Sequence, residues 1–387
     1  MSLQTSDVPV GEPTVRTRGG RRPSQTCGVL GWLLRSYSPL VVTGPAAGAV
    51  ERVERLTKRA TDTLVLRMHV LEELRRAVPF DAYAWLLTDP ETEVGTSPLA
   101  DVPWFDQLSR HILLKYLTPL NRWTALLDRP VALLHEAAEG DLGQSRLWRE
   151  LLRERGVVDA ASVVFRDRYG CWGFLELWRL APSGTFSTAD RELLASVAPA
   201  LTAGVRRLQA ETLVQAPQPG QPAGGPVVLV LSCGLEVHSM TAQTQQYLRV
   251  LVPPDSDHPP VPASAYNVAA QLLAAEAGVD DHPAWARVHL RDGVWVTLRA
   301  ARLSADDLAV TIERTTPAER IDLFCRAFGL SPRERDVLVS LAGGSDTRHV
   351  AASLFVSEHT IQDHLKSIFG KTSLRSRREL LSAAIGT

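Results

Sequence analysis

The sequence has few cysteines, and they lie far apart. Its 387 residues include only Cys27, Cys171, Cys233 and Cys325, with no Cys-x-x-Cys pair and no cluster of cysteine with histidine. This spacing argues against a zinc site and against a disulfide framework. Unpaired thiols indicate a reducing compartment. We therefore expect a cytoplasmic protein with no bound metal and no cofactor.

Long apolar runs are also missing. The best one, Cys27–Leu34, is much shorter than the roughly 20 residues that a membrane-spanning helix needs, and Arg35 follows it. The arginine-containing segment before it is too long and too rich in proline and glycine for a signal peptide. We expect no contact with a membrane. Residues 1–47 are predicted to form a flexible leader, and a start codon placed too early would give the same pattern.

Familiar catalytic motifs are not found. The sequence has no P-loop, no Gly-x-Ser-x-Gly, no His-Glu-x-x-His and no glycine fingerprint for a dinucleotide. The adjacent acids Asp280–Asp281 and Asp306–Asp307 are expected to face solvent in turns. These observations argue against an enzyme, and a net charge of −1 argues against a protein that coats polyanions.

Residues 330–387 carry the clearest local signals, because capping residues divide them into four short helices. The second and third helices are predicted to form a helix-turn-helix, and Gly343 and Gly344 can end the first helix. In the third helix, Ile361, Leu365 and Ile368 form an apolar stripe at i, i+4 and i+7. The start signals of the four helices are Ser331, Ser345 or Asp346, Ser357 and Ser376.

This stretch resembles the LuxR-type DNA-binding domain. The resemblance implies that the third helix enters the major groove of double-stranded DNA, and that a symmetric homodimer reads two half-sites about one helical turn apart. RNA polymerase is expected as a further partner. The matching segments are LSPRER at 330–335, Gly344–Ser345, SEHTI at 357–361, HLK at 364–366, Ile368-Phe369-x-Lys371 and Ser376-Arg377-x-Glu379-Leu380.

The outer face of the third helix supplies the candidate DNA contacts. At about 100° per residue, His359, Asp363 and Lys366 point away from the apolar stripe, with Gln362 and Ser367 on its flanks. Lysine suits phosphate or guanine, glutamine suits adenine, and a carboxylate accepts from the cytosine amine. The family usually has a basic residue at the position of Gln362, and the acidic Asp363 is also unusual. The candidates for contact with the phosphate backbone are Thr347, Thr360, Lys371, Arg375 and Arg377.

The alternative for these polar residues is an ordinary solvated face. From Leu330 onward there are eight basic and six acidic residues, a net charge of only +2. One copy should therefore bind DNA weakly, and a dimer is needed for useful affinity.

Residues 48–213 are predicted to form a first α+β domain. The patterns indicate one long helix over Glu51–Val78, a strand over Phe80–Leu87, a mostly helical segment 101–155, a hairpin over Ala161–Leu180 and a helix capped by Ser187. The order resembles a GAF domain, most clearly at WGFLEL (172–177) and FSTAD (186–190). This resemblance implies a sheet that can host a small-molecule effector. The candidate pocket residues are Tyr83, Trp85, Trp104, Trp123, Trp148 and Trp172, and the alternative is that they are core.

A proline- and glycine-rich linker, residues 214–226, precedes a second α+β domain over residues 227–315. Its predicted elements are a strand, a helix over Met240–Leu251, a helix capped by Ser264, a hairpin with an Asp-Gly turn and a last strand. The order resembles a PAS domain, and the alternative is a spacer without a ligand. A connecting helix is predicted within residues 316–329.

The sequence thus predicts a multidomain α+β protein: a GAF-like domain, a PAS-like domain and a C-terminal all-α LuxR-type helix-turn-helix over residues 330–387. The function expected is that of a sequence-specific DNA-binding transcriptional regulator, controlled by a small molecule or a partner. The alternative is a protein-interaction module, for example for RNA polymerase, without ligand sensing.

Overall fold

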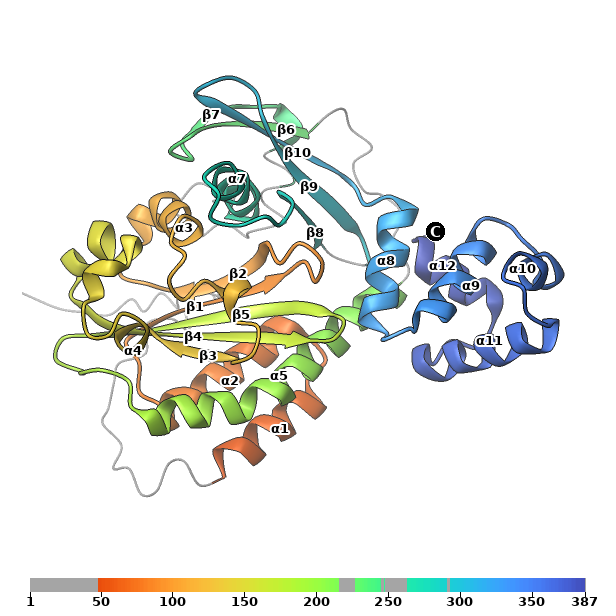
Figure 1. Cartoon of the computed structure of the whole chain (residues 1–387), viewed down its shortest axis with the longest axis horizontal. Helices are drawn as coiled ribbons and strands as arrows, with labels where there is room; N and C mark the ends of the chain where they lie inside the picture. Colours follow the sequence, from red (N-terminus) through yellow and green to blue (C-terminus); the bar gives the residue numbers. More distant parts are fainter. Residues whose placement is uncertain (1–47, 216–226, 245–246, 248–262, 291–292, 387) are drawn as a thin grey trace, which may run out of the picture. The chain divides into compact units, whose positions relative to one another are not determined.

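The computed structural model describes residues 48–215, 227–244, 247, 263–290 and 293–386. They form two five-stranded antiparallel sheets with their helices, followed by a C-terminal bundle of helices (Figure 1). The expected mixed α+β fold is confirmed at this level. The predicted leader, most of the predicted linker and most of the predicted helix 240–251 lie outside the described residues. All described residues belong to one structural unit of the chain, Val42–Thr387.

The first helical segment is broken into two helices. The prediction of one helix over Glu51–Val78 was wrong, because α1 (Ala49–Arg59) and α2 (Thr63–Ala77) are separated by a short turn. The cause is Asp62, whose carboxylate accepts hydrogen bonds from the backbone N–H groups of Leu64 (2.7 Å) and Val65 (3.1 Å) and so starts a new helix. The apolar pattern continues through the break, which is why it misled the prediction.

The first sheet consists of β1 (Ala82–Thr88), β2 (Gly95–Asp101), β3 (Val131–Leu133), β4 (Val157–Asp167) and β5 (Gly170–Leu180), in the order β2-β1-β5-β4-β3. The predicted strand β1 and the β4–β5 hairpin are confirmed. The strands β2 and β3 were not predicted. The sequence of β2 contains Pro98 and no alternation of apolar residues, which an edge strand tolerates. Only three residues make up β3, and they lie in the segment expected to be helical.

Helices cover both faces of this sheet. On one side lie α1, α2 and the long α5 (Thr188–Val214), which begins with the predicted capping box of Ser187 and Asp190 (Figure 1). On the other side lies α3 (Leu108–Tyr116), within an insert between β2 and β4. The remaining helical pieces of this insert are short: Phe105–Gln107, Trp123–Ala125, α4 (Leu134–Ala137), Leu142–Gln144, Trp148–Leu152 and Arg153–Arg155.

The second sheet repeats the strand order of the first. It consists of β6 (Val227–Ser232), β7 (Val237–Met240), β8 (Trp285–His289), β9 (Trp295–Arg302) and β10 (Asp307–Arg314), in the order β7-β6-β10-β9-β8. One helix packed on it is α7 (Ala263–Glu276). The β8–β9 hairpin and the strands β6 and β10 were predicted. The strand β7 was not predicted, and Met240 ends this strand instead of starting a helix. The expected cap at Ser264 was wrong, because Ser264 lies inside α7 instead of preceding it.

A further helix, α8 (Pro317–Ala327), follows the second sheet and confirms the predicted connecting helix. It starts with a capping box in which Thr316 and Glu319 bond each other's backbone N–H groups. Its buried side includes Ile321, Leu323 and Phe324. None of the helices in the described ranges is long and apolar enough to cross a membrane.

Candidate nucleic-acid interface

Residues 330–386 form the four predicted helices: α9 (Pro332–Ala342), α10 (Thr347–Ser353), α11 (Glu358–Thr372) and α12 (Arg377–Ile385). Each begins at a predicted cap. In every case the side-chain oxygen of the cap accepts a backbone N–H from the first turn, and the caps are Ser331, Asp346, Ser357 and Ser376. The structure therefore selects Asp346 over Ser345 as the start of the second helix.

The turn between α10 and α11 contains a strained and exposed residue. Phe355 has φ of 56°, in the left-handed region that non-glycine residues rarely adopt, and 94% of its surface is exposed. The two residues after it lead directly into α11, so this conformation sets the angle between the two helices.

We expect Phe355→Gly to raise the free energy of unfolding by about 0.5–1 kcal/mol. Glycine removes the cost of the left-handed backbone, and the greater freedom of the unfolded chain offsets part of that gain. Val356→Gly is the matched control, because Val356 has no positive φ, and it should lower stability. Urea unfolding of the full chain measures both. A loss of stability in the Phe355 variant would mean that the phenyl ring makes stabilising contacts.

The helix α11 has one buried and one exposed face, as predicted. Ile361, Leu365 and Ile368 are buried in the core of the bundle. His359, Gln362, Asp363 and Lys366 are exposed. His359 Nε2 lies 3.8 Å from a carboxylate oxygen of Asp363, one turn further along the helix. The exposed face thus carries a lysine, an amide and a histidine–aspartate pair.

The C-terminal half of α11 is hydrogen-bonded to α9 through the buried carboxylate of Glu334. Ser367 Oγ donates to Glu334 Oε1 at 2.6 Å, and Lys371 Nζ donates to Glu334 Oε2 at 2.6 Å. Burial acts to raise the pKa of Glu334, but the bonds from Lys371 and Ser367 outweigh it and hold the pKa at about 2. Two predicted DNA contacts, Ser367 and Lys371, therefore also fix the position of α11.

The remaining predicted contacts lie around α11. Arg375 is exposed on the segment before α12, and the guanidinium of Arg377 donates to the carbonyl oxygen of Ser345 at 2.5 Å. The hydroxyl of Thr360 lies 2.9 Å from that of Ser357, and Thr347 is half-buried at the start of α10. The contacts of Glu334 with Ser367 and Lys371 were not predicted, because the sequence shows only its part in the capping box.

The six aromatic residues proposed as pocket lining do not gather in one place. Tyr83, Trp85 and Trp172 lie on the sheet face that packs against α1, α2 and α5. Trp104, Trp123 and Trp148 lie on the opposite face, in two different clusters. Trp123 stacks on Phe174 with ring centroids 4.3 Å apart, and Trp104 donates to His111 at 2.8 Å. None of the six lines the described pockets.

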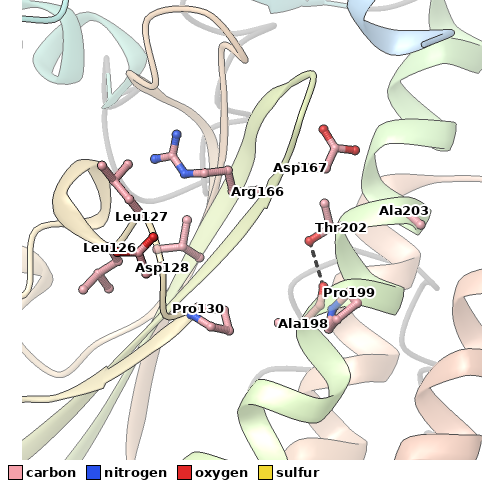
Figure 2. Close-up of a pocket in the computed structure, with 11 residues that line it drawn as sticks. Leu126, Leu127, Asp128, Pro130, Arg166, Asp167, Ala198, Pro199, Thr202 and Ala203 are labelled. Atoms are coloured by element: carbon pink, nitrogen blue, oxygen red, sulfur yellow. Dashed lines mark hydrogen bonds between the residues drawn. The ribbon is translucent and has the colours of Figure 1, made fainter.

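An open pocket lies elsewhere in the first domain, between α5 and the segment that leads into β3 (Figure 2). It has a volume of about 480 Å³. Its polar groups include Asp128, Arg166 and Thr202, and Arg166 is already paired with Glu93. The apolar part of the lining is Leu126, Leu127, Pro130, Val164, Ala198, Pro199 and Ala203.

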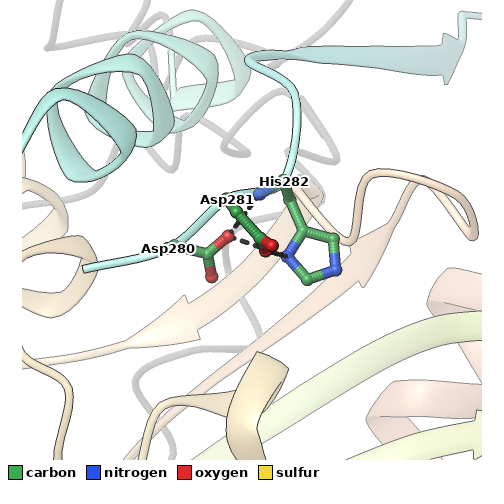
Figure 3. A group of neighbouring side chains, drawn as sticks. All are labelled: Asp280, Asp281 and His282. Carbon is green, nitrogen blue, oxygen red and sulfur yellow. Dashed lines mark hydrogen bonds and ion pairs between the residues drawn. The ribbon is translucent and has the colours of Figure 1, made fainter. Parts of the chain in front are cut away.

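The acidic turn at Asp280 differs from its prediction. Asp281 is exposed, but the side chain of Asp280 is only 2% exposed, so the expectation that both face solvent was wrong for Asp280. Its carboxylate accepts from the ring Nδ1 of His282 at 2.7 Å (Figure 3). It also accepts from Arg122 Nε (2.7 Å) and Thr124 Oγ1 (2.7 Å). The three neighbours Asp280, Asp281 and His282 have the spacing of metal ligands. The positive partners of Asp280 already balance its charge, so we assign the group to an ion-pair network.

His282 makes the stability of this network depend on pH. Its hydrogen bonds to Asp280 and then to Glu93 raise its pKa to about 10. A raised pKa contributes stability that is complete below the unfolded value of about 6.5 and is lost as pH rises toward 10.

We therefore expect the urea midpoint of the wild-type chain to exceed that of His282→Gln at pH 6, and the difference to shrink steadily toward about pH 10. His69→Gln, at an exposed position on α2, is the control and should follow the wild type. A difference that does not change with pH would show that His282 is neutral in the folded protein.

The arrangement of α9 to α12 defines a class of protein domain, the helix-turn-helix, with α10 and α11 as its two central helices and a polar outer face on α11. Residues 329–384 match the family described as "Bacterial regulatory proteins, luxR family". The C-terminal domain is therefore a LuxR-family DNA-binding domain, as the sequence predicted.

Similar proteins match this chain over short stretches. A probable HTH-type transcriptional regulator, GfsR of Streptomyces halstedii, is 35% identical over 60 residues, which are 16% of this chain and 25% of that protein. The CsgBAC operon transcriptional regulatory protein of Escherichia coli strain K12 is 36% identical over 55 residues, or 14% and 26%. The chain thus spans about a quarter of the length of these relatives.

Among solved structures, Escherichia coli SdiA is similar over 87% of this chain and 96% of its own, with 14% identity and a TM-score of 0.33. A TM-score this low does not establish a shared fold.

Proposed function

We propose that this protein is a sequence-specific DNA-binding transcriptional regulator that acts as a homodimer. The observation that carries the proposal is the exposed face of α11 in a LuxR-family helix-turn-helix. On this face the side chains of Gln362 and Lys366 make no hydrogen bond or ion pair with other described residues. The domain's net charge of +2 supports two copies per operator, because one copy offers few contacts to phosphates.

The two upstream domains are proposed to be GAF-like and PAS-like and to control DNA binding. This assignment is supported by the two sheets, which are both antiparallel, have five strands and share one strand order. A small-molecule effector must bind two states of the chain unequally to change its activity. The open pocket between α5 and the Leu126–Pro130 segment is the proposed place for it, since the aromatic residues are packed into the core.

Selection from random DNA with the full chain tests this proposal. We expect enrichment of a two-fold symmetric sequence and, in gel shifts, affinity that falls steeply as salt rises. Failure to enrich any sequence, with and without cell extract as a source of effector, would refute it.

A second function is favoured by two observations. Phe355 exposes an apolar ring at the tip of the helix-turn-helix, and Asp363 places a negative charge on α11. Both suit an interaction module that contacts a protein such as RNA polymerase. In that case the chain should bind the polymerase without DNA, and Phe355→Ser should abolish this binding.

A further inference from the structure

One arginine donates hydrogen bonds to the first domain, the second domain and the helix-turn-helix. Arg320 lies on α8 and is 3% exposed. Its Nη2 donates to the carbonyl oxygen of Leu213 in the last turn of α5 (2.9 Å), its Nη1 to that of Gly293 between β8 and β9 (3.2 Å), and its Nε to that of Ala383 in the last turn of α12 (3.2 Å). The first acceptor belongs to the first domain, the second to the second domain and the third to the helix-turn-helix.

The guanidinium has an unusual environment for a buried charge. Among the described residues no carboxylate lies within ion-pair distance of it. Burial lowers its pKa to about 10, so it is still charged at neutral pH. Two of its acceptors are carbonyl groups in the last turns of helices, where four carbonyls have no partner within the helix and the helix dipole is negative. Arg320 therefore satisfies the ends of α5 and α12 with one group, and it is itself satisfied only while all three parts are together.

The space around the guanidinium is closely filled. Gly386, with φ of 80°, follows α12, and a Cβ atom at this position would lie 2.7 Å from Arg320 Nε. A Cβ atom on Gly293 would lie 2.2 Å from the carbonyl oxygen of Gln215. The three chain segments thus approach each other as closely as glycine permits, and small shifts of any of them break a bond to Arg320.

Neighbouring contacts hold α8 and α9 to the same domains. Asp322 accepts from Arg287 of β8 at 3.2 Å and from Arg335 of α9 at 3.1 Å. Tyr169, in the turn between β4 and β5, donates its hydroxyl to the carbonyl oxygen of Gly329 at 3.2 Å. The exposed face of α11 takes part in none of these contacts.

We propose that Arg320 is a positioning residue for DNA binding: it fixes the orientation of the helix-turn-helix relative to the two sheet domains, and in a dimer this orientation sets the distance between the two half-sites. This step rests on the proposed dimeric DNA binding. Loss of the guanidinium leaves each domain folded but allows the helix-turn-helix to rotate relative to the two sheet domains.

Hydrogen exchange of the full chain tests the orientation directly. In Arg320→Met, which keeps the aliphatic stem, amides in the last turns of α5 and α12 should exchange roughly tenfold faster, as expected when a buried carbonyl loses its donor. Amides of α11 and β5 should stay within about twofold. Arg314→Met, an exposed position at the end of β10, is the control. Unchanged exchange, or equal acceleration throughout the chain, overturns the proposal.

Gly386→Ala is the second variant. Its Cβ atom displaces the guanidinium without any change to the Arg320 residue itself, and Gly386 lies outside the core. It should accelerate exchange in the same two helix ends. If Arg320→Met does not fold, this variant alone decides, and normal exchange in it overturns the proposal.

A DNA library with half-sites at varied separations provides the functional readout. The wild-type chain should select one separation, and Arg320→Met should accept several with the same half-site sequence. A merely less stable protein would bind less but keep the single separation, which would overturn the assignment. If the wild type selects no DNA at all, the proposed function fails, whereas the exchange experiment still decides whether Arg320 fixes the orientation.

Discussion

Replacing Asp89 with alanine is expected to lower the free energy of unfolding by about 3–5 kcal/mol, because it leaves the buried charge of Arg287 without its main partner. Both side chains are 0% exposed. Arg287 Nε lies 2.7 Å from Asp89 Oδ2, Arg287 Nη2 lies 2.9 Å from Oδ1, and the backbone N–H of Arg287 also donates to Oδ2 at 2.9 Å. Asp89 follows β1 and Arg287 lies on β8, so the pair joins the two sheet domains.

Denaturant unfolding at neutral pH measures this effect. Asp306→Ala, at an exposed position, is the control and should change stability by less than about 0.5 kcal/mol. Asp89→Asn keeps the shape but removes the charge, so it should fall between alanine and wild type. A loss below 1 kcal/mol in Asp89→Ala would mean that Glu91 and Asp322, which lie 3.1 and 3.2 Å from Arg287, suffice to balance it.

Acid should remove the contribution of the Asp89 carboxylate to the free energy of unfolding. Burial acts to raise the pKa of Asp89, but the charge and hydrogen bonds of Arg287 reverse this and hold the pKa below its ordinary value. A lowered pKa contributes stability above the unfolded value of about 3.9, and this is lost as pH falls through the folded value. The stability difference between wild type and Asp89→Asn should therefore shrink on strong acidification.

Reversal of the charge at Lys366 is expected to weaken binding to a selected operator about 100-fold, and Lys366→Ala about 10-fold. The lysine is exposed on the outer face of α11, where a charged hydrogen bond to phosphate or guanine is lost and, with glutamate, replaced by repulsion. If the contact is to a phosphate, the salt dependence of Lys366→Ala should also fall by about one unit of slope. Fluorescence anisotropy at several salt concentrations measures both quantities.

Lys58→Ala removes an exposed lysine on α1, outside the helix-turn-helix, and should bind DNA like the wild type. Equal affinity of wild type and Lys366→Glu would take Lys366 out of the DNA contacts and would favour the protein-interaction function instead.

The C-terminal domain was predictable because its signals are local. Each helix start depends on a cap and its own first turn, and the apolar stripe of α11 repeats within one helix. The β4–β5 hairpin and the capping box of α5 were predictable for the same reason. The strands β2 and β3 were not, since β2 lacks an apolar pattern and β3 has three residues. Their conformation comes from pairing with β1 and β4.

Contacts between residues far apart in the sequence could not be predicted either. Asp280 appeared to belong to an exposed acidic turn, and only the fold brings it to Arg122, 158 positions earlier. Arg320 has no local pattern at all, because its three acceptors are backbone carbonyls from separate segments. The aromatic residues were correctly recognised as inward-facing, but the sequence did not reveal which face of the sheet each one occupies.

The carboxylate of Asp363 has a consequence for how the protein would search a chromosome. It lies on the exposed face of α11, three residues before Lys366 in the sequence, and is paired with His359. Where a cytosine or adenine amine meets it, the carboxylate gains a hydrogen-bond donor. Where it faces guanine or thymine acceptors or phosphates, it is repelled. Such a helix would dissociate quickly from sequences that place an acceptor at this position, so the protein would spend little time on them.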